Sequence, residues 1–299
     1  MSLLNIGLVL LSSLLHSVWN ILTQTSKNSQ YFSGLKGIWV MVMALIAYAG
    51  FGIAPLSDEI IFWGILSGIL HGVYILCLSR AYSTADISYV YPIARSAPVF
   101  VPVFAWLFLD EHLSIFTFLA IGLILTAIYI LHFEGQLIQG FKNLIKAVRD
   151  QDLRWAFITL AMVVSYSLVD KKGMDSFLSH LPDQPFVNGI TFFFIEATLG
   201  FFLCNVYLFI KHPAKDILLT WKSEWKKAIL AGTATLGSYG LICVVLQFEA
   251  LSAIVTLRQV SVLMVVYWGC WKLKEPFGPQ RILAGALILI GIFLIGINS

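Results

Sequence analysis

Two arginines lie inside long apolar segments and are the first residues of this sequence that could bind an anion. Arg95 lies between Pro92 and Pro98, and Arg258 lies in the apolar segment 252–272. An arginine at bilayer depth is costly and normally faces protein or water rather than lipid. Its planar guanidinium can hold a carboxylate or a phosphonate through two parallel hydrogen bonds. Both arginines could therefore contact an anionic ligand. Alternatively, each could pair with a protein acid or with the carbonyls of a broken helix and only hold segments together.

Two acids in or beside apolar segments are the candidate partners of these arginines. Glu196 lies in TFFFIEATLG, with apolar residues on both sides, so it could carry a coupling proton or form an ion pair with an arginine. Asp170 is followed by Lys171 and Lys172. It could therefore face a buried site or lie at a membrane interface.

One segment near the N-terminus carries polar and aromatic residues at helical spacing. His16, Trp19 and Asn20 are spaced i, i+3 and i+4, so they share one face of a helix. Trp19 could stack on a cationic group and Asn20 could hydrogen-bond a ligand. The alternative is that all three contact a neighbouring helix. Tyr91, four residues before Arg95, is the further aromatic residue that we assign to this site.

A third group is expected to serve packing. Gly64, Gly68 and Gly72 recur at every fourth position, a spacing that lets another helix approach closely. His71, next to Gly72, is expected to be a packing histidine. Four isolated cysteines in apolar runs are expected to be small buried side chains rather than metal ligands.

Motifs of the common enzyme classes are missing from the sequence. It contains no GxSxG, no P-loop, no GxGxxG and no HExxH. We therefore expect no catalytic activity, no metal or cofactor, and no transport driven by ATP bound to this chain.

The composition indicates that most of the chain lies in lipid. Hydrophobic residues make up 59% of the 299 residues and charged residues 12%, with a mean hydropathy of +0.87, which is typical of a polytopic membrane protein. The net charge is only +3, and the basic residues lie in short connections rather than in one cluster. Nucleic-acid binding is therefore not expected.

Apolar runs of about 20 residues predict an all-α protein with ten transmembrane helices. Their ranges are 3–24, 33–53, 60–82, 87–109, 114–132, 153–171, 186–210, 226–248, 252–272 and 279–297. The longest connection, at about 134–152, has apolar residues at helical spacing opposite lysines and an arginine. It is expected to be an amphipathic helix on the membrane surface, or alternatively a solvated linker.

The distribution of basic residues predicts an orientation. Fifteen lysines and arginines were assigned to the connections on one side, Lys36 and Arg80 among them, against only Lys171 and Lys172 on the other. The positive-inside rule places the first set in the cytoplasm and both termini outside it. We expect the inner membrane of a bacterium.

The sequence also repeats itself. The matching segments are 107–125 with 272–290, and 16–20 with 166–170. The first match aligns Glu111 with Glu275, which we interpret as structural acids at helix ends, and places Arg95 over Gln259. Because five helices per half is an odd number, the halves, 1–133 and 153–299, would enter the membrane in opposite directions. This is the inverted-topology repeat of many secondary transporters, which places a site near the bilayer midplane.

This pattern resembles the drug/metabolite transporter superfamily and its EamA domain. The resemblance covers essentially the whole chain and lies in the ten short spans and in A-L-x-x-x-x-A…P-x-x…L-x-x-x-E at the fourth and ninth. LHSVWN (15–20), VYPIARSAPV (90–99), YSLVDKKG (166–173) and LRQVSV (257–262) are similar to an EamA subgroup associated with phosphonate utilisation. In the last motif this sequence has Gln259 where an acid is expected.

The resemblance implies a secondary transporter that works by alternating access. Superfamily members move substrates from amino acids to sugar phosphates and toxic cations, so membership does not choose a substrate. The arginines favour a small zwitterionic or anionic metabolite, such as an amino acid or an aminophosphonate. The expected site residues are His16, Trp19, Asn20, Tyr91, Arg95, Arg258 and Gln259, in a cavity lined by spans one, four, six and nine.

Other readings of the residues stay open. Glu196 with the aromatic residues would suit an exporter of cationic or aromatic compounds instead. A membrane enzyme or an assembly subunit is the alternative outside transport. Protons are the expected coupling ion, and the protein is expected to be a monomer or a homodimer in the lipid bilayer.

Overall fold

The computed structural model describes residues 1–84, 93, 96–112, 114–132, 154–261 and 279–297. In these ranges the regular structure is entirely helical. The helices are α1 (Leu3–Gln24), α2 (Ser29–Phe51), α3 (Asp58–Thr84), α5 (Ala97–Leu109), α6 (Ile115–His132), α8 (Arg154–His180), α9 (Pro185–Lys211), α10 (Ala214–Leu246), α11 (Leu251–Leu257) and α13 (Pro279–Ile297). These ten helices fit the ten predicted spans.

The agreement is close for the first, fifth, seventh and tenth spans and poorer elsewhere. α8 continues nine residues beyond the predicted end at 171, and α10 begins twelve residues before the predicted start at 226. Both extensions are rich in polar and charged residues, so hydropathy gave no signal for them, although nothing in their sequence breaks a helix. The predicted linker at 134–152 lies outside the described residues.

Short connections with strong end signals separate the helices. Asn28 caps α2, because its side chain accepts hydrogen bonds from the backbone N–H groups of Gln30 and Tyr31. α9 begins with Pro185, whose missing N–H is not needed in a first turn. Gly52 ends α2 with φ +82°, a conformation that glycine adopts without a steric penalty.

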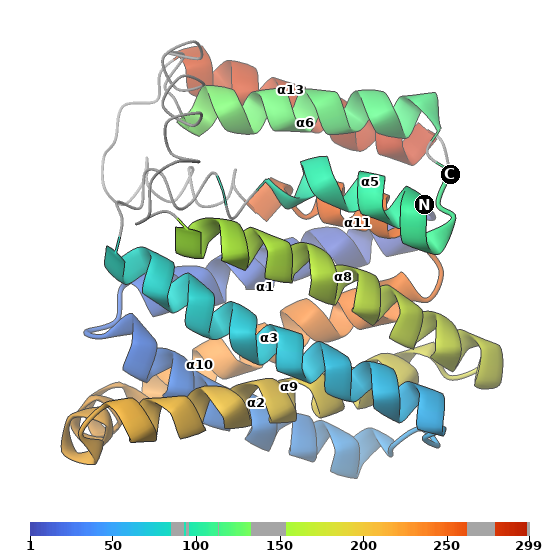
Figure 1. Cartoon of the computed structure of the whole chain (residues 1–299). Coiled ribbons are helices and arrows are strands. Elements are labelled where there is room, and N and C mark those ends of the chain that lie inside the picture. Colours follow the sequence, from blue (N-terminus) through green and yellow to red (C-terminus); the bar gives the residue numbers. More distant parts are fainter. Residues whose placement is uncertain (85–92, 94–95, 113, 133–153, 262–278, 298–299) are drawn as a thin grey trace.

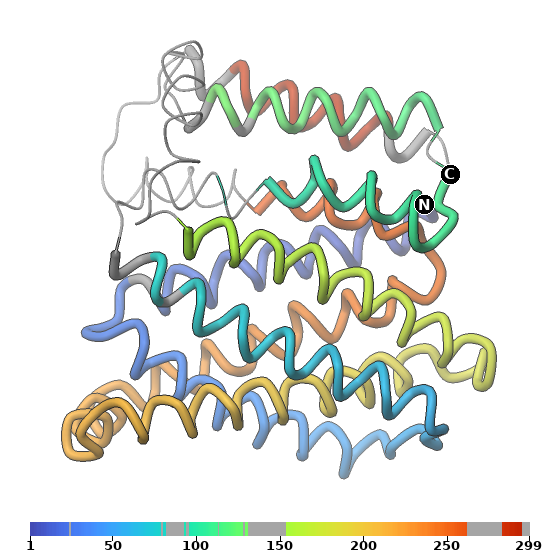
Figure 2. Tube along the Cα trace, viewed as in Figure 1, coloured from blue at the N-terminus to red at the C-terminus, as the bar shows by residue number. Residues whose placement is uncertain are grey.

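The helices run roughly side by side in one bundle (Figure 1). α3 packs along both α8 and α9, α1 packs along α10, and α2 contacts α9 and α10. α6 and α13 pack on each other at one edge of the bundle, next to α5 and α11 (Figure 2). α1 begins and α13 ends on the same side of the bundle. Segments from both ends of the sequence therefore enclose its centre.

The glycine stripe of α3 allows its close contact with α9, as predicted. A Cβ at Gly68 would lie 2.8 Å from Leu199 Cβ and 3.0 Å from the carbonyl oxygen of Glu196. A Cβ at Gly64 would lie 2.8 Å from Ile195 Cγ2. Real Cβ atoms do not approach other atoms so closely, so only glycine permits this helix spacing. The contact brings the polar residues of α3 next to Glu196.

The outer surface of the bundle is apolar. Large side chains such as Phe108, Phe118, Ile210 and Phe293 expose more than half of their surface. Five described helices are long and apolar enough to cross a membrane, and shorter apolar helices occur within α5, α6 and α13. A surface of this kind is suited to lipid rather than to water.

Candidate functional site

A cavity of about 640 Å³, counted out to its opening, lies inside the bundle. It is lined by residues of α1, α2, α3, α8, α9 and α10, and by Arg258 at the end of α11. Both halves of the chain contribute to the lining, and the lining involves more helices than the four predicted from the sequence.

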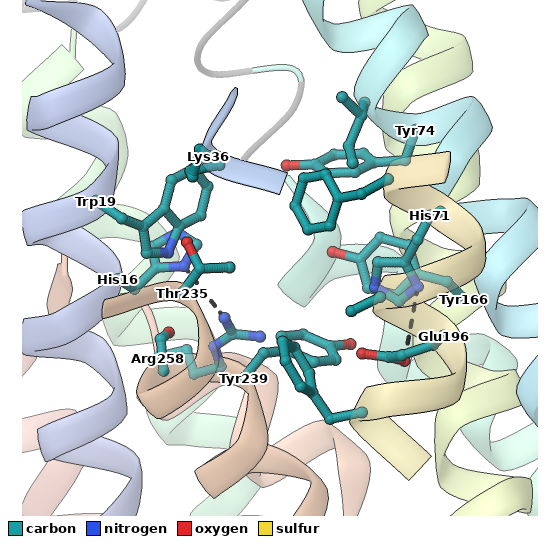
Figure 3. A pocket seen from close by; sticks show the side chains of 16 residues that line it. His16, Trp19, Lys36, His71, Tyr74, Tyr166, Glu196, Thr235, Tyr239 and Arg258 are labelled. Atoms are coloured by element: carbon teal, nitrogen blue, oxygen red, sulfur yellow. Dashed lines mark hydrogen bonds and ion pairs between the residues drawn. The ribbon is translucent and has the colours of Figure 1, made fainter. Parts of the chain in front are cut away.

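One wall of the cavity carries positive charge. Arg258 points into the cavity, where its Nη2 lies 3.3 Å from His16 Nδ1 and its guanidinium lies over the ring of Tyr239 at 5.3 Å (Figure 3). In the described part of the chain Arg258 forms no ion pair with a carboxylate. The described residues therefore show no protein acid that holds this arginine.

Lys36 is the second cation of this wall. Only 5% of its surface is exposed, and its Nζ lies 4.0 Å from the centre of the Trp19 ring and 5.8 Å from that of Phe201. Trp19 in turn contacts His16 edge to face, with ring centres 4.8 Å apart. Lys36, Trp19, His16 and Arg258 thus form a continuous surface along one side of the cavity (Figure 3).

The opposite wall carries acids and aromatic rings. Glu196, with 2% of its surface exposed, faces the cavity beside His71 and Tyr166 (Figure 3). His71 stacks on Tyr166, with ring centres 4.0 Å apart. Asp170 lies directly behind and is fully buried. A positively charged group would find both an acid and aromatic faces here.

A serine joins the two acids. Ser67 Oγ lies 2.5 Å from Asp170 Oδ1 and 2.9 Å from Glu196 Oε2, and Tyr239 donates a hydrogen bond to Asp170 Oδ2. The single hydroxyl hydrogen of Ser67 can go to only one carboxylate, so the second contact needs a proton of its own. Asp170 accepts from two hydroxyls, which suits the ionised form and assigns the extra proton to Glu196.

The same group could also hold a cation. One ligand atom each of His71, Asp170 and Glu196 lies within 4.8 Å of the other two. The sequence analysis expects no metal here. The hydrogen-bond pattern around Ser67 is satisfied by a proton, which is also the coupling ion expected from Glu196.

The helix that carries Arg258 is broken next to the cavity. α11 ends at Leu257, and the N–H groups of Gln259 and Ser261 bond three residues back, to Thr256 and Arg258. The amide of Gln259 donates to the carbonyl of Val255 at 3.3 Å. Irregular backbone in an apolar bundle is tolerated where it packs against protein or lines a cavity.

Serines of α1 contact this irregular backbone. Ser13 Oγ lies 3.5 Å from the carbonyl oxygen of Arg258, and Ser17 Oγ donates to that of Ser261 at 3.1 Å. Both serines are one turn or less from His16 on the same helix. The residues that hold the broken helix and the residue that contacts its arginine therefore belong to one segment.

Glu111 holds the other end of α11. Its carboxylate accepts the N–H of Leu251 at 2.5 Å, and the N–H and hydroxyl of Ser252 at 3.2 and 2.7 Å. α11 has no side-chain cap of its own at Ala250. Glu111 thus caps the first turn of a distant helix, in agreement with its interpretation as a structural acid. Glu275 lies outside the described residues.

The predicted site residues are distributed as follows. His16, Trp19, Arg258 and Glu196 line the cavity, and Asp170 lies behind Glu196. The side chain of Asn20 donates to the His16 carbonyl of its own helix, and the buried Gln259 bonds Val255; neither lines the cavity. Tyr91 and Arg95 lie outside the described residues.

Sequence reasoning missed Lys36 and undervalued His71. Lys36 was counted with the loop cations of one membrane face, whereas it is buried within α2 and faces the cavity, so it does not belong in that count. The signal was present, because Lys36 lies in SGLKGIWV inside a predicted span. His71 packs on Tyr166 as expected but also lines the cavity.

Comparisons with known proteins bear on the fold and the family. Residues 3–133 match the model of the EamA-like transporter family. The whole chain superposes on a crystal structure of a protein with a TM-score of 0.74 and 13% identity, covering 100% of this chain and 98% of that chain. At this identity the likeness shows the fold alone. No curated protein matches the chain.

Together, the apolar helices and the family match indicate an integral membrane protein. The phosphonate-associated subgroup rests on the sequence motifs alone and stays a prediction. Residues 3–133 of this membrane protein are thus similar to the EamA-like transporter family.

Proposed function

We propose that the protein is a secondary transporter that moves a small zwitterionic metabolite, such as an amino acid or an aminophosphonate, by alternating access. The observation that carries the proposal is the charge arrangement of the cavity. Lys36 and Arg258 lie on one wall, and Glu196, backed by Asp170, lies on the other. A solute with an anionic and a cationic end can satisfy both walls at once.

The packing of the helices supports an inverted repeat. In chain order the first described helix packs on the eighth (α1 on α10), and the sixth packs on the third (α8 on α3). The second contacts the eighth, and the seventh contacts the third. If each helix is replaced by the helix five places away in chain order, the α1–α10 contact becomes the α8–α3 contact, and the α2–α10 contact becomes the α9–α3 contact. A two-fold relation between the halves requires this correspondence.

The broken ninth span supports the transport mechanism. Discontinuous helices at the midplane are how many secondary transporters expose backbone and side-chain groups to a substrate. Here the break places Arg258 in the cavity while Ser13 and Ser17 lie against the carbonyls of Arg258 and Ser261. A proton on the Glu196–Asp170 pair would provide coupling, because an arriving ammonium group would compete for the same carboxyl oxygens.

One observation favours the export of cationic aromatic compounds as a second candidate. His71, Tyr74 and Tyr166 form a ring cluster beside Glu196, a suitable surface for a quaternary amine. That reading leaves the two cations of the opposite wall without a role. The zwitterion accounts for both walls and is therefore the better fit.

The test is uptake into proteoliposomes that contain the purified protein. Arg258→Ala should reduce the transport of a zwitterion by about a hundredfold, the cost of removing a buried charge contact, whereas Lys222→Ala, at an exposed position of α10, should leave it unchanged. Both variants should elute as folded protein in detergent. Undiminished transport by the Arg258 variant would refute the proposal. Inhibition of transport by quaternary amines, with no inhibition by acids, would also refute it and would favour the cation exporter.

A further inference from the structure

Lys36 is a buried basic residue in the wall of the cavity. It is 95% buried, it faces the cavity, and in the described part of the chain its Nζ has no hydrogen bond and no carboxylate partner. Among the described residues, its Nζ lies over the faces of Trp19 and Phe201. A buried charge without a partner is costly, so such groups are normally paired or bind a ligand. Lys36 therefore points to an anion in the cavity.

Arg258 is a second cation in the same situation. Arginine is only a donor, so the contact of its Nη2 with His16 Nδ1 makes that nitrogen an acceptor. The imidazole of His16 is therefore neutral and adds no charge to this wall. The remaining donors of Arg258 have no hydrogen-bond acceptor in the described part of the chain. Within the described ranges, two positive charges on this wall thus have no protein counter-charge.

The opposite wall carries one negative charge. Because Ser67 bridges Asp170 and Glu196 with a single hydrogen, one proton must accompany the two carboxyl groups. That proton lies on Glu196, whose contact with Ser67 requires it, and His71 Nδ1 lies 3.8 Å from Glu196 Oε2. Among the described residues of the cavity, two cations and one anion leave one positive charge uncompensated.

We propose that the preferred ligand carries one ammonium group and two negative charges, with Lys36 and Arg258 both engaged by the negative end. This inference rests on the proposed transport function and narrows its substrate class. A dianionic phosphonate or phosphate ester beside an amine satisfies it, and so does an amino acid with two carboxylates. A zwitterion of zero net charge leaves Lys36 or Arg258 without a counter-charge.

The experiment uses ligands of one skeleton and different charge. Binding to the purified wild-type protein in nanodiscs at pH 7 is measured for 2-aminoethylphosphonate, 2-aminoethanesulfonate and 3-aminopropanoate. All three have an ammonium group two carbons from the anionic group, but only the phosphonate carries two negative charges at this pH. A second arm compares glutamate with glutamine.

The doubly negative member should bind about tenfold or more tightly than its singly negative relatives in at least one arm. Preference in the phosphonate arm alone identifies a tetrahedral dianion, and preference in the glutamate arm alone identifies two carboxylates. Equal binding within each arm, or tighter binding of the singly negative ligands, would overturn the inference.

Lys36→Met tests the residue itself, because methionine keeps an unbranched side chain without the charge. The variant should lose most of the preference for the doubly negative ligand, while Lys36→Arg and Lys222→Met should keep it. A Lys36→Met protein that is folded and retains the full preference would overturn the role of Lys36. If the variant does not fold, the wild-type ligand series still tests whether the protein prefers the doubly negative ligand.

The outcomes separate this inference from the function on which it rests. If zwitterions are bound and transported without regard to the second negative charge, the substrate class is wrong and the transport proposal stands. If the wild-type protein neither binds nor transports any of these ligands, the proposed function fails, and the inference fails with it.

Discussion

The cap that Glu111 provides for α11 gives a sharp prediction about stability. Glu111→Gln keeps the size of the side chain but removes the charge and replaces one acceptor oxygen with an NH₂ group. The backbone N–H groups of Leu251 and Ser252 both donate hydrogen bonds to the Glu111 carboxylate. The new NH₂ group would place a second donor against one of them. Loss of an N-terminal cap costs about 0.5–2 kcal/mol, and loss of an anion from a helix N-terminus about 0.3–1 kcal/mol. We therefore expect a loss of about 2 kcal/mol.

The measurement is thermal unfolding in detergent, with the neighbouring acid as the matched control. Asp110→Asn removes the same charge one residue earlier, at an exposed position with φ +53°, which asparagine tolerates well. Glu111→Gln should lower Tm by several degrees, at about 2–4 °C per kcal/mol, and Asp110→Asn should not.

The same variant separates a structural role from a role in binding. Because Glu111 contacts backbone rather than the cavity, the Kd of folded Glu111→Gln for substrate should stay within about twofold of the wild-type value. Equal Tm values for the Glu111 and Asp110 variants would refute the capping argument. A large loss of affinity at unchanged Tm would make Glu111 a functional acid instead.

Three further substitutions test the contacts that position the site. Gly68→Ala should destabilise the protein by about 1–3 kcal/mol, because its Cβ must push α3 away from α9. Gly122→Ala, where a Cβ meets open space, should be neutral or slightly stabilising in the same thermal assay. Ser17→Ala should cost about 1–3 kcal/mol, because it removes the donor to the broken helix; unchanged unfolding would show that the carbonyl has another partner. Tyr239→Phe should weaken substrate binding roughly tenfold by removing the donor to Asp170, and equal affinity would exclude an effect of that bond.

The sequence by itself determined the class of the protein and the identity of its intramembrane charges. Apolar runs of bilayer length predict the helices, because a chain in lipid must satisfy its backbone hydrogen bonds within each segment. The glycine stripe of α3 predicts a close helix contact, and the isolated Arg258 and Glu196 predict a polar site. These are local properties, which spacing and hydropathy report directly.

Only the tertiary structure decided which of these residues face one another. The sequence placed Lys36 inside a predicted span but could not place it in the cavity wall, because that position depends on Trp19 and Phe201, which other helices bring next to it. Nor could it join Ser67 to Asp170 and Glu196, which come from three helices. Each of these contacts is made between segments far apart in the chain, and their geometry follows from helix packing rather than from any local pattern.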